Sequence, residues 1–367
     1  MKTFKNLAEE WFDEYAKFKL RSTTYERMEL LRDRTYEALG NKLITKITTK
    51  DIQLFINSLA TDGANKKTGA PLSAKTITHY YTFISDVFNF AERFDMIKSN
   101  PCKNVVLPRK VQKEKKIYSQ EEVSALLEKL KGEPLKYQAF FYLAAYSGFR
   151  RGEMLGLEWK DIDFDENIIS VNRTSNYTPE RGIYTDVTKT LRSERTIKVS
   201  EYIIDILIDL HEEQLQEMKD YKGTDYIYSD RLFIKSNGGP MYPSTPYAWL
   251  KKFCTRNNFP FYGVHTFRHF AASALISAGL DVATVARTLG HSTPGTTLNI
   301  YSHAFNTAQA KAAAAMDNAF LFLSQDKNRS VADSVSEKGE KINVADSIKT
   351  LQHFAEQMGK HLKIEFI

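Results

Sequence analysis

Apolar residues in the first hundred positions of the chain recur at helical spacing. Between Phe4 and Phe18 they return every three or four residues, and residues 76–94 carry a broad apolar stripe. Thr48, followed by an acidic residue three positions later, has the pattern of a capping box, and Ser73 is placed to cap the helix after it. No segment here combines β-branched residues with alternation. Residues 1–106 are therefore predicted to form a small helical domain.

A different pattern begins near residue 118. Ser119 and Glu122 form a second capping-box pattern, and helical periodicity then alternates with short β-branched segments bounded by turn residues. The predicted strands lie within residues 168–174, 182–188 and 194–200. Helical periodicity returns after His265. The expected fold is mainly α with a small antiparallel β-sheet, in which a mixed α+β domain spans 118–323.

Two segments differ from these domains in composition. Residues 107–117 are a predicted linker with five basic side chains, Arg109, Lys110, Lys113, Lys115 and Lys116. Such a run is either a solvated charged segment or a hinge that contacts DNA phosphates. Residues 324–367 are a predicted flexible tail whose last part repeats apolar residues every three or four positions. That amphipathic helix would pack on its own domain or bind a partner.

Composition narrows the class of protein. The chain has 367 residues, which suits two or three domains, and a net charge of +6, which raises the expectation of a nucleic-acid partner only slightly. It lacks an apolar run long enough for a bilayer, and its N-terminus lacks the apolar core of a secretion signal. A cytoplasmic protein without a membrane partner is expected. Cys102 and Cys254 are too few for a disulfide framework and belong to no metal-binding motif.

The first candidate site is the segment SGFRRGE at residues 147–153. Arg150 and Arg151 are adjacent and so point about 100° apart on a helix, which means that only one can face a given site. A guanidinium there is either a surface charge or a group that binds a phosphate through paired hydrogen bonds. Glu153 lies three residues after Arg150, where its carboxylate can fix that arginine.

The next two candidates are Lys189, in a predicted turn between two strands, and an HxxR motif. A hairpin lysine is usually exposed and inert, but on a hairpin that reaches a duplex it could donate a proton. His265 and Arg268 share a face at the start of a helix, where free amide groups favour an anion. His269 is expected to point elsewhere and receives no role.

The last candidates lie in LGHSTPGTTLNIYSH at residues 289–303. His291 follows a glycine turn, and a short helix with Pro294 in its first turn is predicted to carry Tyr301. His291 and His303 could suggest a metal, but their spacing matches no common site and no carboxylate or cysteine joins them. No metal is expected.

Taken in order, these boxes resemble those of the tyrosine recombinase family, of the phage-integrase type, over roughly residues 4–322. The family's box TGxRxGE is similar to SGFRRGE, which selects Arg150 rather than Arg151. Its HxxR box matches His265 and Arg268, and its LGH box ends at His291. Its hairpin lysine and its nucleophile fall on Lys189 and Tyr301. Residues 1–106 are similar to the family's core-binding domain, which clamps DNA.

The resemblance implies a mechanism. Tyr301 would attack the scissile phosphorus and form a 3′-phosphotyrosine, while Arg150 and Arg268 hold the non-bridging oxygens and Lys189 protonates the leaving 5′-oxygen. His265 would accept or orient the tyrosine proton. His291 would hydrogen-bond the phosphate, and Glu153 would orient Arg150. No metal or nucleotide cofactor is implied, because the guanidiniums supply positive charge and the covalent bond conserves the phosphodiester energy.

The resemblance also implies partners. These are double-stranded DNA at specific recombination sites and three further copies of the chain, forming a homotetramer that passes through a Holliday junction to integrate or excise a mobile element. An excisionase and a DNA-bending protein are possible accessory partners. Three alternatives stay open: a type IB topoisomerase, a Xer-type chromosome-dimer resolvase, and a non-catalytic DNA-binding protein.

Overall fold

The structure is a computed structural model that describes residues 2–109, 116–187 and 194–302, with a few positions between 304 and 317. The chain divides into two units, Met1–Phe305 and Asn306–Ile367, and the description concerns the first. Lys110, Lys113, Lys115, Lys189 and the predicted tail helix all lie outside the described residues. None of the described helices is both long and apolar enough to span a bilayer.

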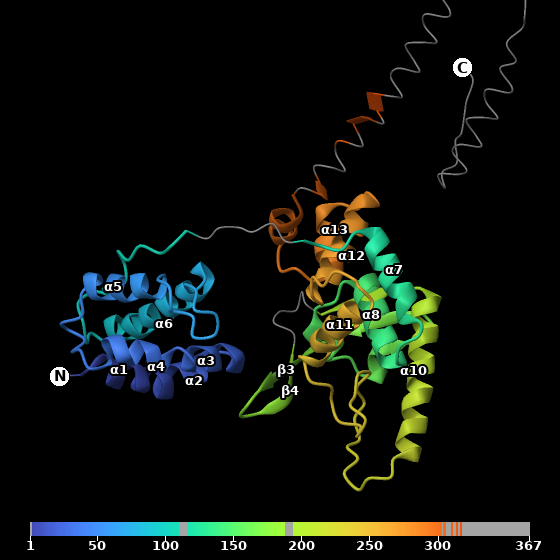
Figure 1. Ribbon diagram of the computed structural model, residues 1–367, viewed down its shortest axis with the longest axis horizontal. Coiled ribbons are helices and arrows are strands. Elements are labelled where there is room, and N and C mark those ends of the chain that lie inside the picture. The colour runs from blue at the N-terminus through green and yellow to red at the C-terminus, as the bar shows by residue number, and fades with distance from the viewer. Residues whose placement is uncertain are drawn as a thin grey trace, which may run out of the picture. The chain divides into compact units, whose positions relative to one another are not determined.

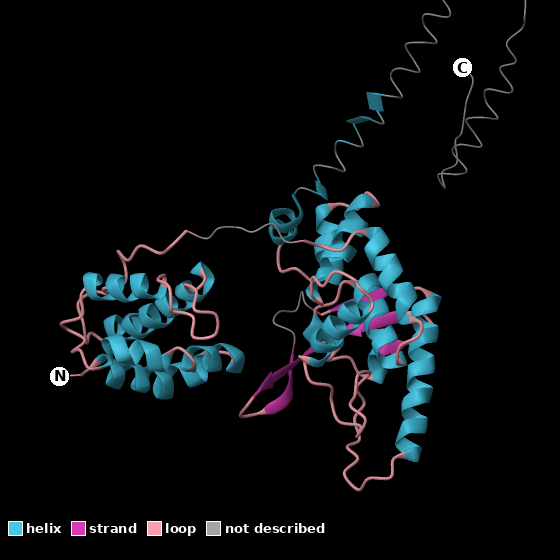
Figure 2. Ribbon diagram, in the orientation of Figure 1, coloured by secondary structure: helices cyan, strands magenta, loops and turns pink. Residues whose placement is uncertain are grey.

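The N-terminal hundred residues are helical, as the apolar spacing predicts (Figures 1 and 2). Thr48 and Ser119 open helices through capping boxes, and Ser73 accepts a hydrogen bond from the Thr76 amide. The predicted helix at residues 4–18 contains a π-helical turn in its middle. The elements are α1 (Phe4–Trp11), η1 (Phe12–Ala16), α2 (Lys17–Lys19), α3 (Ser22–Glu29), α4 (Arg32–Thr35), η2 (Tyr36–Gly40), α5 (Thr49–Leu59) and α6 (Ala74–Arg93).

Helix α6 is the centre of the first hydrophobic core. The predicted stripe is buried except for Tyr81, which is partly buried, and two further phenylalanines of the same helix, Phe83 and Phe90, join it. Phe83 packs against Phe4 and Phe12 with ring centroids 6.4 and 5.5 Å away. This core contains buried residues from Phe4 to Cys102, and buried residues after Tyr118 form a second cluster.

The second part combines helices with short strands. Its helices are α7 (Gln120–Leu130), α8 (Leu135–Ser147), α9 (Arg151–Met154), the 3₁₀ turn η3 (Trp159–Asp161), α10 (Glu201–Asp220), α11 (Thr245–Arg256), α12 (His265–Ser277), α13 (Val282–Leu289) and a helix over residues 294–302. Its strands are β1 (Ile162–Asp163), β2 (Ile168–Val171), β3 (Arg173–Thr178), β4 (Gly182–Val187) and β5 (Arg195–Lys198).

These strands form two sheets rather than one. One sheet has the antiparallel order β1-β2-β5, with Val171 opposite Arg195, and β3 pairs with β4 in a separate hairpin. The chain changes sheet at Asn172, between β2 and β3. Lys189 lies between two strands in sequence, as predicted, but the expectation that these strands form a hairpin is wrong. The segment that contains it joins β4 to β5, which belong to different sheets.

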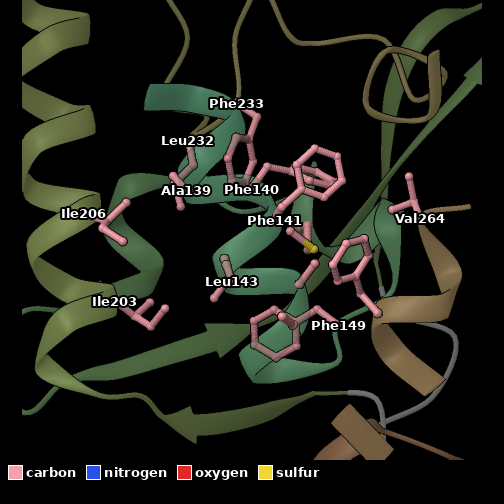
Figure 3. Close-up of a cluster of buried hydrophobic side chains, with 14 of the residues drawn as sticks. Ala139, Phe140, Phe141, Leu143, Phe149, Ile203, Ile206, Leu232, Phe233 and Val264 are labelled. Carbon is pink, nitrogen blue, oxygen red and sulfur yellow. The ribbon is translucent and has the colours of Figure 1, made fainter. Parts of the chain in front are cut away.

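Helix α8 lies at the centre of the second core, and this explains its sequence. Its residues are apolar on nearly every side, which is typical of a helix buried all round. Figure 3 shows Phe140 and Phe141 of this helix beside Phe233, with Ile203 and Ile206 of α10 also facing the cluster. The ring centroids of Phe140 and Phe233 are 5.1 Å apart. Helices α7, α10 and α12 pack around α8.

Helix α5 offers a matched test of the first core. Leu59 is 2% exposed and Leu54 is 58% exposed on the same helix. We expect Leu59→Ala to lower the free energy of unfolding by about 2–5 kcal/mol, because it leaves a cavity. Leu54→Ala should change it by less than about 0.5 kcal/mol. Hydrogen exchange of α6 peptides measures both, and equal protection in the two variants would contradict this description of the core.

Candidate active site

Gly148 produces the sharp turn that places Arg150. It ends α8 in the left-handed conformation, with φ of 63°, and a Cβ atom there would lie 2.8 Å from Leu289 Cδ2. Only glycine fits both requirements without strain. The chain then turns, and Arg150, whose backbone is extended, lies directly before the first residue of α9. The glycine of the SGFR segment therefore sets the direction of the arginine.

A buried carboxylate holds two arginines. Glu153 is 4% exposed, and its Oε1 accepts a 2.7 Å hydrogen bond from Arg150 Nη1. Its Oε2 accepts 2.8 Å and 2.9 Å bonds from the Arg150 amide and from Arg195 Nη2. Burial alone would raise the pKa of Glu153, but the charges of Arg195 and Arg150 lower it below its ordinary value. Glu153 is therefore ionised at neutral pH, and the predicted contact with Arg150 is present.

Arg195 is a third arginine of the site and was not among the residues predicted from the sequence. Its Nε donates to the Thr288 carbonyl at 2.9 Å, and its guanidinium lies 5.1 Å from the centre of the Phe149 ring. The side chain is 5% exposed. Alternation along β5 puts Arg195 on the same face as Ile197, and this period of two was the available signal.

Arg268 is the most buried cation of the set. It is 2% exposed, and its Nη1 donates to the Gly148 carbonyl at 2.8 Å. Among the residues that the structure describes, its buried Nη2 meets no hydrogen-bond acceptor. Burial and then the charge of Arg150 lower the pKa of Arg268 to about 10, which leaves it protonated at neutral pH. A buried, charged donor without an acceptor is costly unless an anion occupies the site.

A second left-handed glycine arranges the other side of the site. Gly290 ends α13 with φ of 65°, and its carbonyl accepts a 2.9 Å hydrogen bond from Arg150 Nη2. A Cβ atom at this position would lie 2.5 Å from Arg195 Nη1. His291 follows directly, and its Nδ1 lies 2.7 Å from Oγ1 of the buried Thr297. Burial, followed by the charges of Arg268 and Arg150, lowers the pKa of His291 to about 4.

Tyr301 lies on the helix over residues 294–302, as predicted, and is 6% exposed. Its hydroxyl is 2.9 Å from Nδ1 of His269. The expectation that His269 points elsewhere is therefore wrong, because positions 265 and 269 are four apart and share one face of α12. That spacing was present in the sequence. Burial raises the pKa of Tyr301, and the charge of Arg268 opposes the rise.

The remaining candidates are placed as follows. His265 begins α12, as predicted, and its ring lies edge-on to that of His269 with centroids 5.0 Å apart. Arg109 and Lys116 are exposed at either end of the part of the linker that lies outside the described residues, so a contact with DNA stays a prediction. No cluster of three His, Cys, Asp or Glu side chains suited to a metal occurs in the described part of the chain.

The arrangement is suited to a phosphate. The buried carboxylate of Glu153 pairs with Arg150 and Arg195, and its charge also acts on Arg268. One carboxylate for three guanidiniums leaves an excess of positive charge. Arg150 retains a side chain that is 40% exposed, so an anion can approach it. The charge of Arg268 acts on the hydroxyl of Tyr301 and lowers its pKa. The site thus combines an anion-binding group with a potential nucleophile.

Solved structures share this fold. The structure of the Tn1549 transposon integrase in complex with transposon right end DNA matches with a TM-score of 0.70 and 23% identity, covering 85% of this chain and 99% of that one. A lambda integrase tetramer bound to a Holliday junction matches with a TM-score of 0.57 and 15% identity, covering 80% and 77%.

Sequence comparison identifies the family. A XerC-like tyrosine recombinase of Caldanaerobacter subterraneus subsp. tengcongensis is 30% identical over 340 residues, covering 87% of this chain and 84% of that protein. The ICEBs1 integrase of Bacillus subtilis is 28% identical, covering 75% and 72%. Residues 3–60 match the phage integrase N-terminal SAM-like domain, and residues 116–308 match the phage integrase family. The chain belongs to the phage integrase family of tyrosine recombinases.

Proposed function

We propose that this chain integrates or excises a mobile element by cutting and rejoining DNA through a covalent bond to Tyr301. The observation that carries the proposal is an N–H donor of Arg268 that makes no hydrogen bond to any described residue. This donor, on Nη2, is buried. The charge of Arg268 also acts on the Tyr301 hydroxyl, whose pKa it lowers. A non-bridging oxygen of the scissile phosphate would accept that hydrogen bond. Arg150, on the more exposed side, would bind the other oxygen.

The proposed cleavage step follows from these positions. Oη of Tyr301 bonds to phosphorus, the bond to the 5′-oxygen breaks, and the chain is left joined to a 3′-phosphate. Negative charge on the phosphate oxygens grows in the transition state, and fixed guanidiniums stabilise it without rearranging. Lys189 would protonate the leaving oxygen, as the family resemblance implies. Attack by a 5′-hydroxyl of a partner strand reverses the step and completes strand exchange.

His291 has a role that its environment favours. Because its pKa is lowered to about 4, the imidazole is neutral at physiological pH. When Nδ1 accepts the hydrogen bond from the Thr297 hydroxyl, Nε2 carries the proton and would donate it to the phosphate. Glu153 would keep Arg150 in a fixed rotamer, which is the orienting role expected for it, and it would hold Arg195 in the same way.

Partners and domains are proposed on the same basis. Residues 1–106 would form the core-binding domain, 107–117 the linker and 118–323 the catalytic domain, consistent with two separate hydrophobic cores. The similar integrases have been solved with transposon DNA and, as a tetramer, with a Holliday junction. We infer the same partners here, with action on cytoplasmic DNA.

The main test uses a nicked duplex that carries the ends of the chain's own genetic element. Loss of the short fragment beside the nick traps a covalent adduct, which a denaturing gel detects. We expect an adduct with the wild type and with Tyr228→Phe, a tyrosine that is 75% exposed, and none with Tyr301→Phe. Adduct formation should continue in chelator. An adduct with Tyr301→Phe would contradict the proposed nucleophile.

Removing the shared carboxylate should destabilise the site. Glu153→Gln leaves the buried Arg195 without its counter-charge, and we expect the free energy of unfolding to fall by about 3 kcal/mol. The matched control is Glu128→Gln, which breaks an exposed pair with Lys131 and should leave the free energy of unfolding almost unchanged, because water screens the pair. Urea unfolding followed by circular dichroism measures both changes. Similar small losses would show that Glu153 does not organise the arginines.

His291 should titrate far below an ordinary histidine. The unfolded chain binds its proton near pH 6.5 and the folded chain near pH 4. Its contribution to stability is therefore complete above pH 6.5 and declines as the pH falls towards 4. Histidine NMR resonances report the folded pKa, and His291→Gln identifies the resonance. A midpoint at or above pH 6.5 would mean that neither burial nor the arginines lower the pKa of His291.

A further inference from the structure

His269 and Tyr301 come from two different helices and meet at their polar atoms. Nδ1 of His269 is 2.9 Å from the Tyr301 hydroxyl, with the ring centroids 5.6 Å apart and the planes at 61°. The hydroxyl can donate to Nδ1 when the imidazole is neutral and protonated on Nε2. Since Tyr301 is 6% exposed, bulk water reaches little of its side chain.

A buried tyrosine needs help to become a nucleophile. The phenol must lose its proton as Oη bonds to phosphorus, and burial opposes this by raising the pKa of Tyr301. Arg268 acts in the opposite direction but cannot accept a proton, since it is already protonated. A base within about 2.6–3.2 Å of the phenolic oxygen meets the geometric requirement for proton transfer. His269 meets it.

We propose that His269 is the general base that accepts the proton of Tyr301, so that His265, which lies against His269, orients this proton rather than accepting it. As the bond between Oη and phosphorus forms and the bond to the 5′-oxygen breaks, the phenolic proton moves to Nδ1 of His269. The leaving oxygen takes a different proton, from the acid assigned to Lys189. In the rejoining step, His269 returns its proton to Tyr301. This inference rests on the proposed function, in which Tyr301 is the nucleophile.

Other titratable or charged groups surround the pair. His265 lies against His269 on the same helix, and Arg268 acts on Tyr301. The groups that face Arg268 from α9, β5 and the turn after α13 are Arg150, Glu153, Arg195 and His291. These groups act on Arg268, which in turn acts on Tyr301, so a substitution of His269 itself is needed to separate its contribution.

The first test observes the hydrogen bond without DNA. Tyr301 is replaced by 3-fluorotyrosine in the full chain, and its ¹⁹F resonance is followed as the pH is lowered. We expect a step when His269 becomes protonated and can no longer accept the hydrogen bond. The step should persist in His211→Gln, a histidine that packs against Trp159, and disappear in His269→Asn. An unchanged step in His269→Asn would overturn the proposal.

The second test measures single-turnover adduct formation on the nicked duplex. Asparagine places its amide near the position of Nδ1, so His269→Asn keeps a hydrogen bond to Tyr301 but cannot take its proton at neutral pH. We expect adduct formation to slow by about 10²–10⁴-fold and to lose its dependence on a histidine titration. Full activity with His269→Asn, but not with His269→Ala, would mean that His269 only positions the tyrosine and would overturn the role as base.

The two tests separate this inference from the proposed function. No adduct with the wild type would contradict the proposed function, whatever the ¹⁹F titration shows. An adduct that depends on Tyr301 but forms at the same rate, with the same pH profile, in His269→Asn would contradict only the role of His269. Hydrogen exchange of α12 peptides, unchanged between wild type and variant, excludes misfolding as the cause of a lost rate.

Discussion

The contact on which the site depends is the buried carboxylate of Glu153 between Arg150 and Arg195. Three guanidiniums close together repel one another, and without a counter-charge they would move apart or draw in water. Glu153 offsets part of this repulsion and stays ionised because the arginines lower its pKa. It leaves a net positive charge for a phosphate. The same carboxylate joins α9 to β5, so strands and helices are held at the site by one ionic group.

Two left-handed glycines complete this arrangement with backbone atoms. Gly148 ends α8, and its carbonyl accepts a hydrogen bond from Arg268. Gly290 ends α13, and its carbonyl accepts a hydrogen bond from Arg150. Each glycine has a positive φ, and a side chain at either position would also displace a neighbouring side chain, Leu289 or Arg195. The arginines therefore have fixed positions before any ligand arrives. Pre-organised charge of this kind is the usual source of electrostatic catalysis, because no reorganisation is needed during the reaction.

Local signals in the sequence predicted much of this structure, and non-local contacts explain the rest. The capping boxes at Thr48 and Ser119 and the start of α12 at His265 depend on neighbours within four residues, and all three are confirmed. The division of the strands into two sheets depends on pairing between distant segments, which alternation alone cannot specify. Arg195 was missed for the same reason, since its partners are 42 and 93 residues away. His269 was missed although its spacing from His265 was visible.

The central claim is that Tyr301 becomes covalently joined to DNA, and peptide mass spectrometry tests it most directly. The trapped adduct is digested with a nuclease and then with trypsin, which cuts after Arg287 and Lys311. The peptide between these sites contains Tyr301 as its single tyrosine. We expect this peptide to carry a nucleotide linked through its 3′-phosphate to the Tyr301 oxygen. A nucleotide on a peptide that contains another tyrosine, with this peptide unmodified, would show that Tyr301 is not the nucleophile.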